Sequence, residues 1–99
     1  MAKPENNNTL KELVSLLPEK PGIYQYFNND GKIIYVGKAK NLRKRVSSYF
    51  NKDHDSVKTN ILVSKIVDIK HIIVETEEEA LLLENTLIKK YQPRYNVLL

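Results

Sequence analysis

The segment between Gly22 and Val36 constrains the fold most, because its sequence has the pattern of two short strands joined by a turn. The runs GIYQYF and KIIYV are rich in isoleucine, valine, tyrosine and phenylalanine, which favour strands. Between them lies NNDG, whose Asn, Asp and Gly residues tolerate the positive φ angles of a hairpin loop. We therefore predict a β-hairpin with strands over residues 22–27 and 32–36.

Two tyrosines of this hairpin are expected to share a surface. If the loop has an even number of residues, an even-numbered position on the first strand faces an odd-numbered position on the second. Tyr24 and Tyr35 then project from the same face of the hairpin.

The remaining sequence predicts helices and one further strand. Thr9 can cap a short helix that continues to Leu16. Asn41 can cap a second helix, whose apolar stripe includes Leu42 and Tyr49. A third helix over residues 57–66 is expected to bury its apolar positions, which are Ile61, Leu62 and Ile66.

The C-terminal part is predicted to hold a strand over residues 69–75 and a long helix. Thr76 and Glu79 form a capping box at the start of that helix, and Pro93 stops it. The expected class is α+β, a three-stranded antiparallel sheet flanked by helices. We expect a flexible N-terminus at residues 1–8 and a single domain over residues 9–99, since 99 residues suit one core.

Composition excludes several classes of protein. The chain has no cysteine, which rules out disulfides, thiolate metal sites and a thiol nucleophile. No run has the length of a signal peptide core or of a membrane span, so we expect a cytoplasmic protein without membrane contact. GKAK lacks the spacing of a phosphate-binding loop, so no nucleotide cofactor is expected.

Charge is distributed unevenly along the chain. Residues 35–65 hold eight cations against two acids, a net charge of +6, and residues 67–85 hold one cation against six acids, a net charge of -5. A basic segment favours polyanionic partners such as DNA. Lys40, Arg43 and Lys44 are candidate contacts to a DNA backbone, although a solvated helix face explains them equally well.

Glu84 is the most informative acid because of its place on the last helix. It lies four residues after Ala80, four before Ile88 and three before Leu87, which are members of the apolar stripe. A buried, unpaired carboxylate would be costly, so a partner cation or metal is expected. The alternative is a glutamate at the edge of the stripe that reaches solvent or a structural arginine.

Arg45 is the corresponding cation. It follows Leu42 by three residues and precedes Tyr49 by four, so it borders the inward stripe, whereas Arg43 and Lys44 point away. A guanidinium at that position can contact a carboxylate or phosphate through two hydrogen bonds.

The remaining candidates favour phosphodiester hydrolysis. A tyrosine is a poor base unless a cation favours its phenolate, and Lys38 lies three residues after Tyr35. A single carboxylate suits Mg²⁺, which keeps waters and binds substrate phosphates.

The chain resembles the GIY-YIG nuclease superfamily at these residues. GIY occurs at residues 22–24 and YVG at residues 35–37, with Val36 where the signature has isoleucine. The longer strings YVGKAKNLRKRVSSYF and ALLLENTLIKKYQPRYNVLL are similar to the N-terminal domain of the UvrC family, which incises DNA in bacterial nucleotide excision repair. The likeness covers roughly residues 13–99.

This resemblance implies a set of site residues. Carried over position by position, the catalytic set is Tyr24, Tyr35, Lys38, Arg45, Tyr49, Glu84 and Asn96. Glu84 is then the ligand of one Mg²⁺ or Mn²⁺ ion. The implied DNA contacts are Lys38, Lys40, Arg43, Lys44 and Arg45.

The implied reaction is hydrolysis of one DNA strand on the 3′ side of a lesion. Tyr24 or Tyr35 would deprotonate the attacking water, and the resemblance does not distinguish between them. UvrB, with UvrA acting upstream, would be a partner through segments that follow residue 99 in a complete UvrC. Two alternatives stay open, namely a GIY-YIG nuclease with another DNA-processing role and a non-catalytic basic DNA-binding module.

Overall fold

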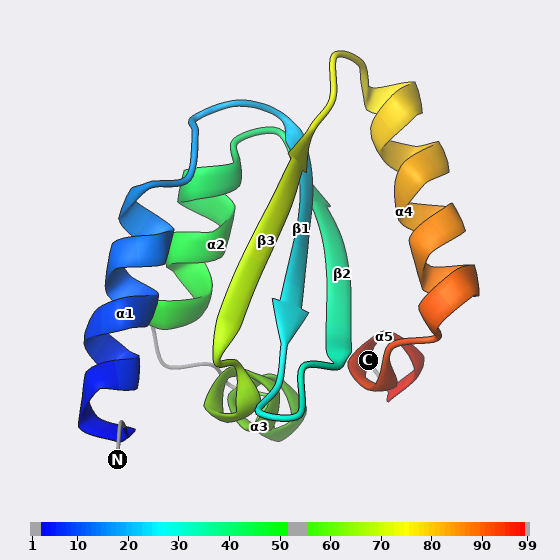
Figure 1. The fold of residues 1–99 in the computed structure, drawn as a ribbon. Helices are drawn as coiled ribbons and strands as arrows, with labels where there is room; N and C mark the ends of the chain where they lie inside the picture. The colour runs from blue at the N-terminus through cyan, green and yellow to red at the C-terminus, as the bar shows by residue number, and fades with distance from the viewer. Residues whose placement is uncertain (1–2, 52–55, 99) are drawn as a thin grey trace.

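The computed structural model describes residues 3–51 and 56–98, and in it a three-stranded sheet lies between helices (Figure 1). The strands are β1 (Gly22–Phe27), β2 (Ile33–Ala39) and β3 (Asp68–Ile73), and β1 pairs antiparallel with both others. The strand order is β2-β1-β3, which confirms the predicted α+β class and its antiparallel sheet.

Helices cover both faces of the sheet. α1 (Lys3–Ser15) and α2 (Leu42–Asn51) lie on one side, and α4 (Glu77–Tyr91) lies on the other (Figure 1). α3 (Val57–Lys65) lies at one end of the sheet, and α5 (Arg94–Leu98) follows α4 after a short turn.

The hairpin has the predicted register at its tyrosines. Tyr26 pairs with Tyr35 and Tyr24 pairs with Gly37, so even positions on β1 face odd positions on β2. Tyr24 and Tyr35 therefore lie on the same face of the sheet, as predicted. A shift in register after Tyr26 lets the loop close, and β2 continues to Ala39 rather than ending at Val36.

Each face of the sheet has its own core. The α4 face buries Ile23, Val36, Val74 and Ala80. The other face, which we call the tyrosine face, carries the larger core. Its buried side chains include Leu10, Val14, Leu17, Tyr24, Tyr26, Leu42, Val46, Tyr49, Leu62, Ile66 and Ile69.

Two of the three predicted helix caps are present, those at Asn41 and Thr76. Asn41 Oδ1 accepts a hydrogen bond from the Lys44 N–H at 3.0 Å, which satisfies a free donor at the start of α2. Thr76 and Glu79 form the reciprocal capping box of α4. Gln92, with φ 42°, takes the left-handed conformation that ends this helix before Pro93.

Several boundaries and positions differ from prediction. α1 begins at Lys3, so Thr9 lies inside this helix and is not its cap. The flexibility of residues 1–8 stays a prediction. Ile61, which was expected to be buried, is 43% exposed because it lies off the face of α3 that packs on the sheet. α5 was not predicted, since proline was taken only as a stop signal.

Candidate active site

Four tyrosine rings meet on the tyrosine face. Tyr24 and Tyr26 come from β1, Tyr35 from β2 and Tyr49 from α2, with ring centroids 5.2–6.4 Å apart. The hydroxyls of Tyr24 and Tyr49 are 3.1 Å apart and share a hydrogen bond. Tyr35 is half-buried, whereas the other three rings are buried.

Burial keeps these phenols protonated. It is the largest cause that raises the pKa of all four tyrosines above the ordinary value of 10.0. The pKa of Tyr49 rises to about 12. For Tyr24, the hydrogen bond with Tyr49 and the Arg45 guanidinium oppose burial without cancelling its effect on the pKa. The guanidinium alone therefore produces no phenolate at neutral pH.

Arg45 lies at the rim of the tyrosine cluster. Its Cζ atom is 5.4 Å from the centroid of the Tyr49 ring. A hydrogen bond with the Tyr24 hydroxyl is the largest cause that raises the pKa of Arg45. Because the side chain is otherwise exposed, it can contact the cluster and a phosphate from solvent together. Its predicted position beside the apolar stripe is confirmed.

Glu84 is half-buried, which fits the alternative of a glutamate at the edge of the apolar stripe rather than a fully buried carboxylate. α4 packs over the centre of the sheet through Leu83 and Leu87, which leaves Glu84 at the edge of the contact. Burial is the main cause that raises the pKa of Tyr35, and the negative charge of Glu84 adds to it through space. Within residues 3–51 and 56–98, the carboxylate makes no ion pair or hydrogen bond.

Asn96 closes the outer edge of β2. Its Oδ1 accepts a hydrogen bond from the Val36 N–H at 2.8 Å, and its Nδ2 donates to the Val36 carbonyl at 2.9 Å. The side-chain amide thus pairs with the strand as another strand would. Val36 follows Tyr35 directly, so Asn96 fixes the backbone that carries this tyrosine.

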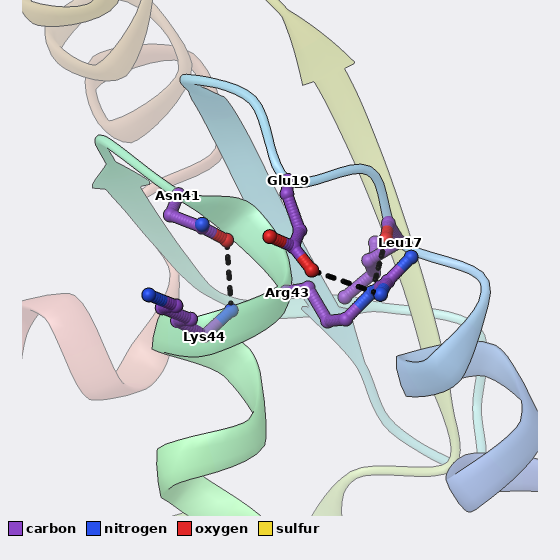
Figure 2. A network of polar contacts seen from close by, with 5 residues as sticks. All are labelled: Leu17, Glu19, Asn41, Arg43 and Lys44. Atoms are coloured by element: carbon purple, nitrogen blue, oxygen red, sulfur yellow. Dashed lines mark hydrogen bonds and ion pairs between the residues drawn. The ribbon is translucent and has the colours of Figure 1, made fainter.

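Arg43 braces the fold, although its side chain is 43% exposed. Its Nε donates to the Leu17 carbonyl at 2.9 Å, and its Nη1 lies 3.1 Å from Glu19 Oε2 (Figure 2). Both contacts tie α2 to the segment between α1 and β1. Lys44 keeps an exposed side chain. Lys40 lies 3.4 Å from Glu77 in an exposed ion pair.

Lys38 lies apart from the tyrosines. It pairs with Ile23 in the sheet, and Ile23 is buried on the α4 face. Its side chain is exposed and lines a hollow of about 450 Å³ together with Glu77 and Ala80. The structure therefore brings Tyr24, Tyr35, Arg45 and Tyr49 together with Glu84 nearby, but it does not bring Lys38 to this face.

Tyr26 is part of the cluster, although sequence reasoning missed it. It follows Tyr24 by two residues, so the alternation of the strand places both rings on one face. Its hydroxyl is buried and has no hydrogen-bond partner among the described residues. The strand period alone was sufficient to find this residue.

Comparison with known proteins identifies the family. A family model described as UvrC-like GIY-YIG domain matches residues 20–97. The chain belongs to the UvrC-like GIY-YIG domain family. It is 67% identical over 95 residues to UvrABC system protein C of Bacteroides thetaiotaomicron, and 67% identical over 99 residues to that of Flavobacterium johnsoniae. It spans 16% of the length of each of these relatives.

Solved structures of this family have the same fold. The GIY-YIG N-terminal endonuclease domain of UvrC from Thermotoga maritima, bound to its catalytic magnesium ion, matches with a TM-score of 0.78 and 39% identity. The match covers 88% of this chain and 94% of that one. Variants of that domain with one tyrosine changed to phenylalanine, or one asparagine to alanine, also hold the cation.

The chain is therefore a UvrC-type GIY-YIG endonuclease domain. The tyrosine cluster and Asn96 are built from the residue types that were varied in the Thermotoga domain. Among the helices that the structure describes, none is long and apolar enough to cross a membrane.

Proposed function

We propose that this UvrC-like GIY-YIG domain hydrolyses one DNA strand on the 3′ side of a lesion in bacterial nucleotide excision repair. The observation that carries the proposal is the tyrosine cluster with Arg45 at its rim, together with an unpaired Glu84 carboxylate whose charge acts on the pKa of Tyr35. The 39% identity to a magnesium-bound UvrC endonuclease domain supports the same chemistry here.

The side chains fit a single magnesium or manganese ion held by Glu84. No cluster of three or more His, Cys, Asp or Glu side chains that could cage a metal occurs in the described part of the chain. One partly exposed carboxylate suits a cation that keeps waters and takes substrate phosphate oxygens as further ligands. When bound, the ion would supply positive charge that favours a phenolate and stabilises the leaving 3′ oxygen.

We assign the general base to Tyr35 rather than to Tyr24. Tyr24 is 1% exposed and its hydroxyl is engaged with Tyr49, whereas Tyr35 is half-buried and lies near Glu84. Its phenolate would accept a proton from water. The hydroxide oxygen would then form a bond to phosphorus while the bond from phosphorus to the 3′ oxygen breaks.

Arg45 would stabilise negative charge on the phosphoryl oxygens, because its exposed guanidinium already borders the cluster. Tyr49 would hold both Tyr24 and Arg45 in place. Lys38 and Lys44 would contact the DNA backbone from outside this centre, since both side chains are exposed.

The proposed biological setting is supported by the relatives, which are UvrABC system proteins. We propose UvrB as the partner that delivers damaged DNA, with UvrA acting before it, and the cytoplasm as the location. Contact with UvrB would use segments outside these 99 residues.

Incision of a lesion-bearing duplex in a UvrB–DNA complex, with Mn²⁺ or Mg²⁺ present, tests the proposal. We expect a single cut on the 3′ side that Glu84→Gln and Tyr35→Phe abolish and Glu78→Gln, on the first turn of α4, preserves. Cutting by Glu84→Gln would contradict it. Salt-sensitive DNA binding without any cutting would instead favour the non-catalytic module.

A further inference from the structure

The two outer edges of the sheet differ. At β2, the Asn96 amide occupies the main-chain donor and acceptor of Val36. At β3, no element of the described chain pairs with the outer edge. In Figure 1, β3 is drawn in front of β1 and no helix passes over it. Proteins usually cover or charge such an edge, because it can template another strand.

The free edge presents aligned main-chain groups. The Val74 N–H donates to the Pro21 carbonyl, and Ile72 pairs with Ile23 in the same register, so the main-chain groups of Ile72 point toward β1. The alternation of an antiparallel ladder turns those of His71 and Ile73 outward. Two neighbouring outward residues provide two donors and two acceptors.

The side chains along this edge favour association. Ile72 and Ile73 are 38% and 49% exposed. The ammonium of Lys70 lies 5.1 Å from the centroid of the Phe27 ring on β1, so this charge points away from the free edge. A hollow with Leu82 in its lining flanks the strand on the α4 face, and one with Leu16 flanks it on the tyrosine face.

We propose that β3 pairs antiparallel with β3 of a second copy of this chain, joining two sheets into one. A two-fold axis perpendicular to the sheet keeps both tyrosine faces on one side. Centred on Ile72, the register sets His71 opposite Ile73 of the other copy, so all four outward groups of each strand are used. Glu75 then lies diagonal to His71 of the other copy, where an imidazole N–H can donate a hydrogen bond to the carboxylate.

The candidate active sites stay open in this pair. β2 is at the opposite edge of each sheet from β3, so Tyr35 and Glu84 lie away from the contact. The acidic segment at Glu75 and Glu79, which disfavours DNA, adjoins the paired strands. The contact is small, so the affinity is expected to be weak.

Sedimentation velocity of the 99-residue chain between about 10 µM and about 1 mM tests the pairing. We expect a monomer that converts to a dimer as concentration rises. Ile73→Pro removes an outward donor, which an edge strand tolerates, and is expected to weaken association about tenfold. Ile73→Val is the matched control, because it keeps the N–H and an apolar side chain of similar shape. Circular dichroism verifies that both variants are folded.

A charge exchange tests the register independently. His71→Glu and Glu75→Lys should each weaken the dimer, the first by repulsion from Glu75 of the other copy, while the double variant should restore it. A chain that stays monomeric at about 1 mM would overturn the proposal. So would a dimer that is unaffected by Ile73→Pro and by both single charge variants.

Discussion

The Tyr24 ring occupies the volume that a side chain at Gly37 would need. A Cβ atom on Gly37 would overlap Tyr24 Cζ and Oη, so the glycine of YVG makes room for the tyrosine of GIY. The two short signatures are thus two halves of one packing contact between β1 and β2. Displacement of Tyr24 would also break its hydrogen bond to Tyr49.

Gly37→Ala should therefore destabilise the domain and abolish cutting. An overpacked core costs roughly 1–3 kcal/mol, which a shift in the urea unfolding midpoint would report. Gly31→Ala is the control, since Gly31 has φ +77° but nothing within 4 Å of an added Cβ. It should cost about 1 kcal/mol of backbone strain and leave cutting intact. Equal activity of the two variants would contradict this contact.

Alkaline pH should destabilise the folded state through the tyrosine cluster. Burial raises the pKa of all four phenols, so the folded state favours their protonated forms. The stability that this gives is complete below about pH 10, the ordinary pKa, and is lost as the pH rises above it.

Tyr26→Phe should reduce the decrease of the unfolding free energy with rising pH, because it removes the buried hydroxyl that has no partner in the described residues. Urea unfolding at pH 8, 9, 10 and 11 measures the effect, with Tyr91→Phe, an exposed ring, as the control. The same pH slope for wild type and Tyr26→Phe would show that this phenol ionises as freely in the folded state as in the unfolded one.

Asn96→Ala should loosen β2 beneath Tyr35. Both Val36 main-chain groups lose their partner, which costs about 1–3 kcal/mol for unsatisfied buried groups, or less if water replaces the amide. We expect faster hydrogen exchange at the Val36 amide and reduced cutting with little change in DNA affinity. A weaker affinity for DNA with unchanged exchange would instead indicate contact with the phosphate.

Substitution of Arg43 should affect mainly stability, and substitution of Lys44 should affect mainly DNA binding. Arg43→Ala removes the links to Leu17 and Glu19 and should lower the unfolding free energy by about 1–2 kcal/mol. Lys44→Ala should instead weaken DNA binding and reduce its salt dependence by about one counterion. Fluorescence anisotropy across a salt series, beside thermal unfolding, checks both. If Arg43→Ala weakened DNA binding without lowering the unfolding free energy, Arg43 would instead be a contact to the DNA backbone.

The sequence predicted the elements whose signals are local. Alternation on two strands was enough to place Tyr24 and Tyr35 on one face, and Thr76 with Glu79 located the start of α4. The position of Arg45 beside the apolar stripe likewise followed from helical spacing. These features depend on residues a few positions apart, so no knowledge of the tertiary structure was needed.

Features that depend on distant segments were not predictable in this way. How far Glu84 is buried depends on how α4 crosses the sheet, and the spacing of residues along a helix does not reveal that crossing. Arg43 was taken as outward because its partners, Leu17 and Glu19, lie in another segment. Asn96 contacts Val36 across 60 positions, and α5 had no periodic signal of its own.

Binding of Mn²⁺ to the purified chain, measured by calorimetry, tests whether Glu84 holds the metal ion. We expect one site per chain, with affinity reduced at least about tenfold by Glu84→Gln. Glu78→Gln, on the first turn of the same helix, should bind as the wild type does. Unchanged affinity in Glu84→Gln would contradict the assignment of this carboxylate as the metal ligand.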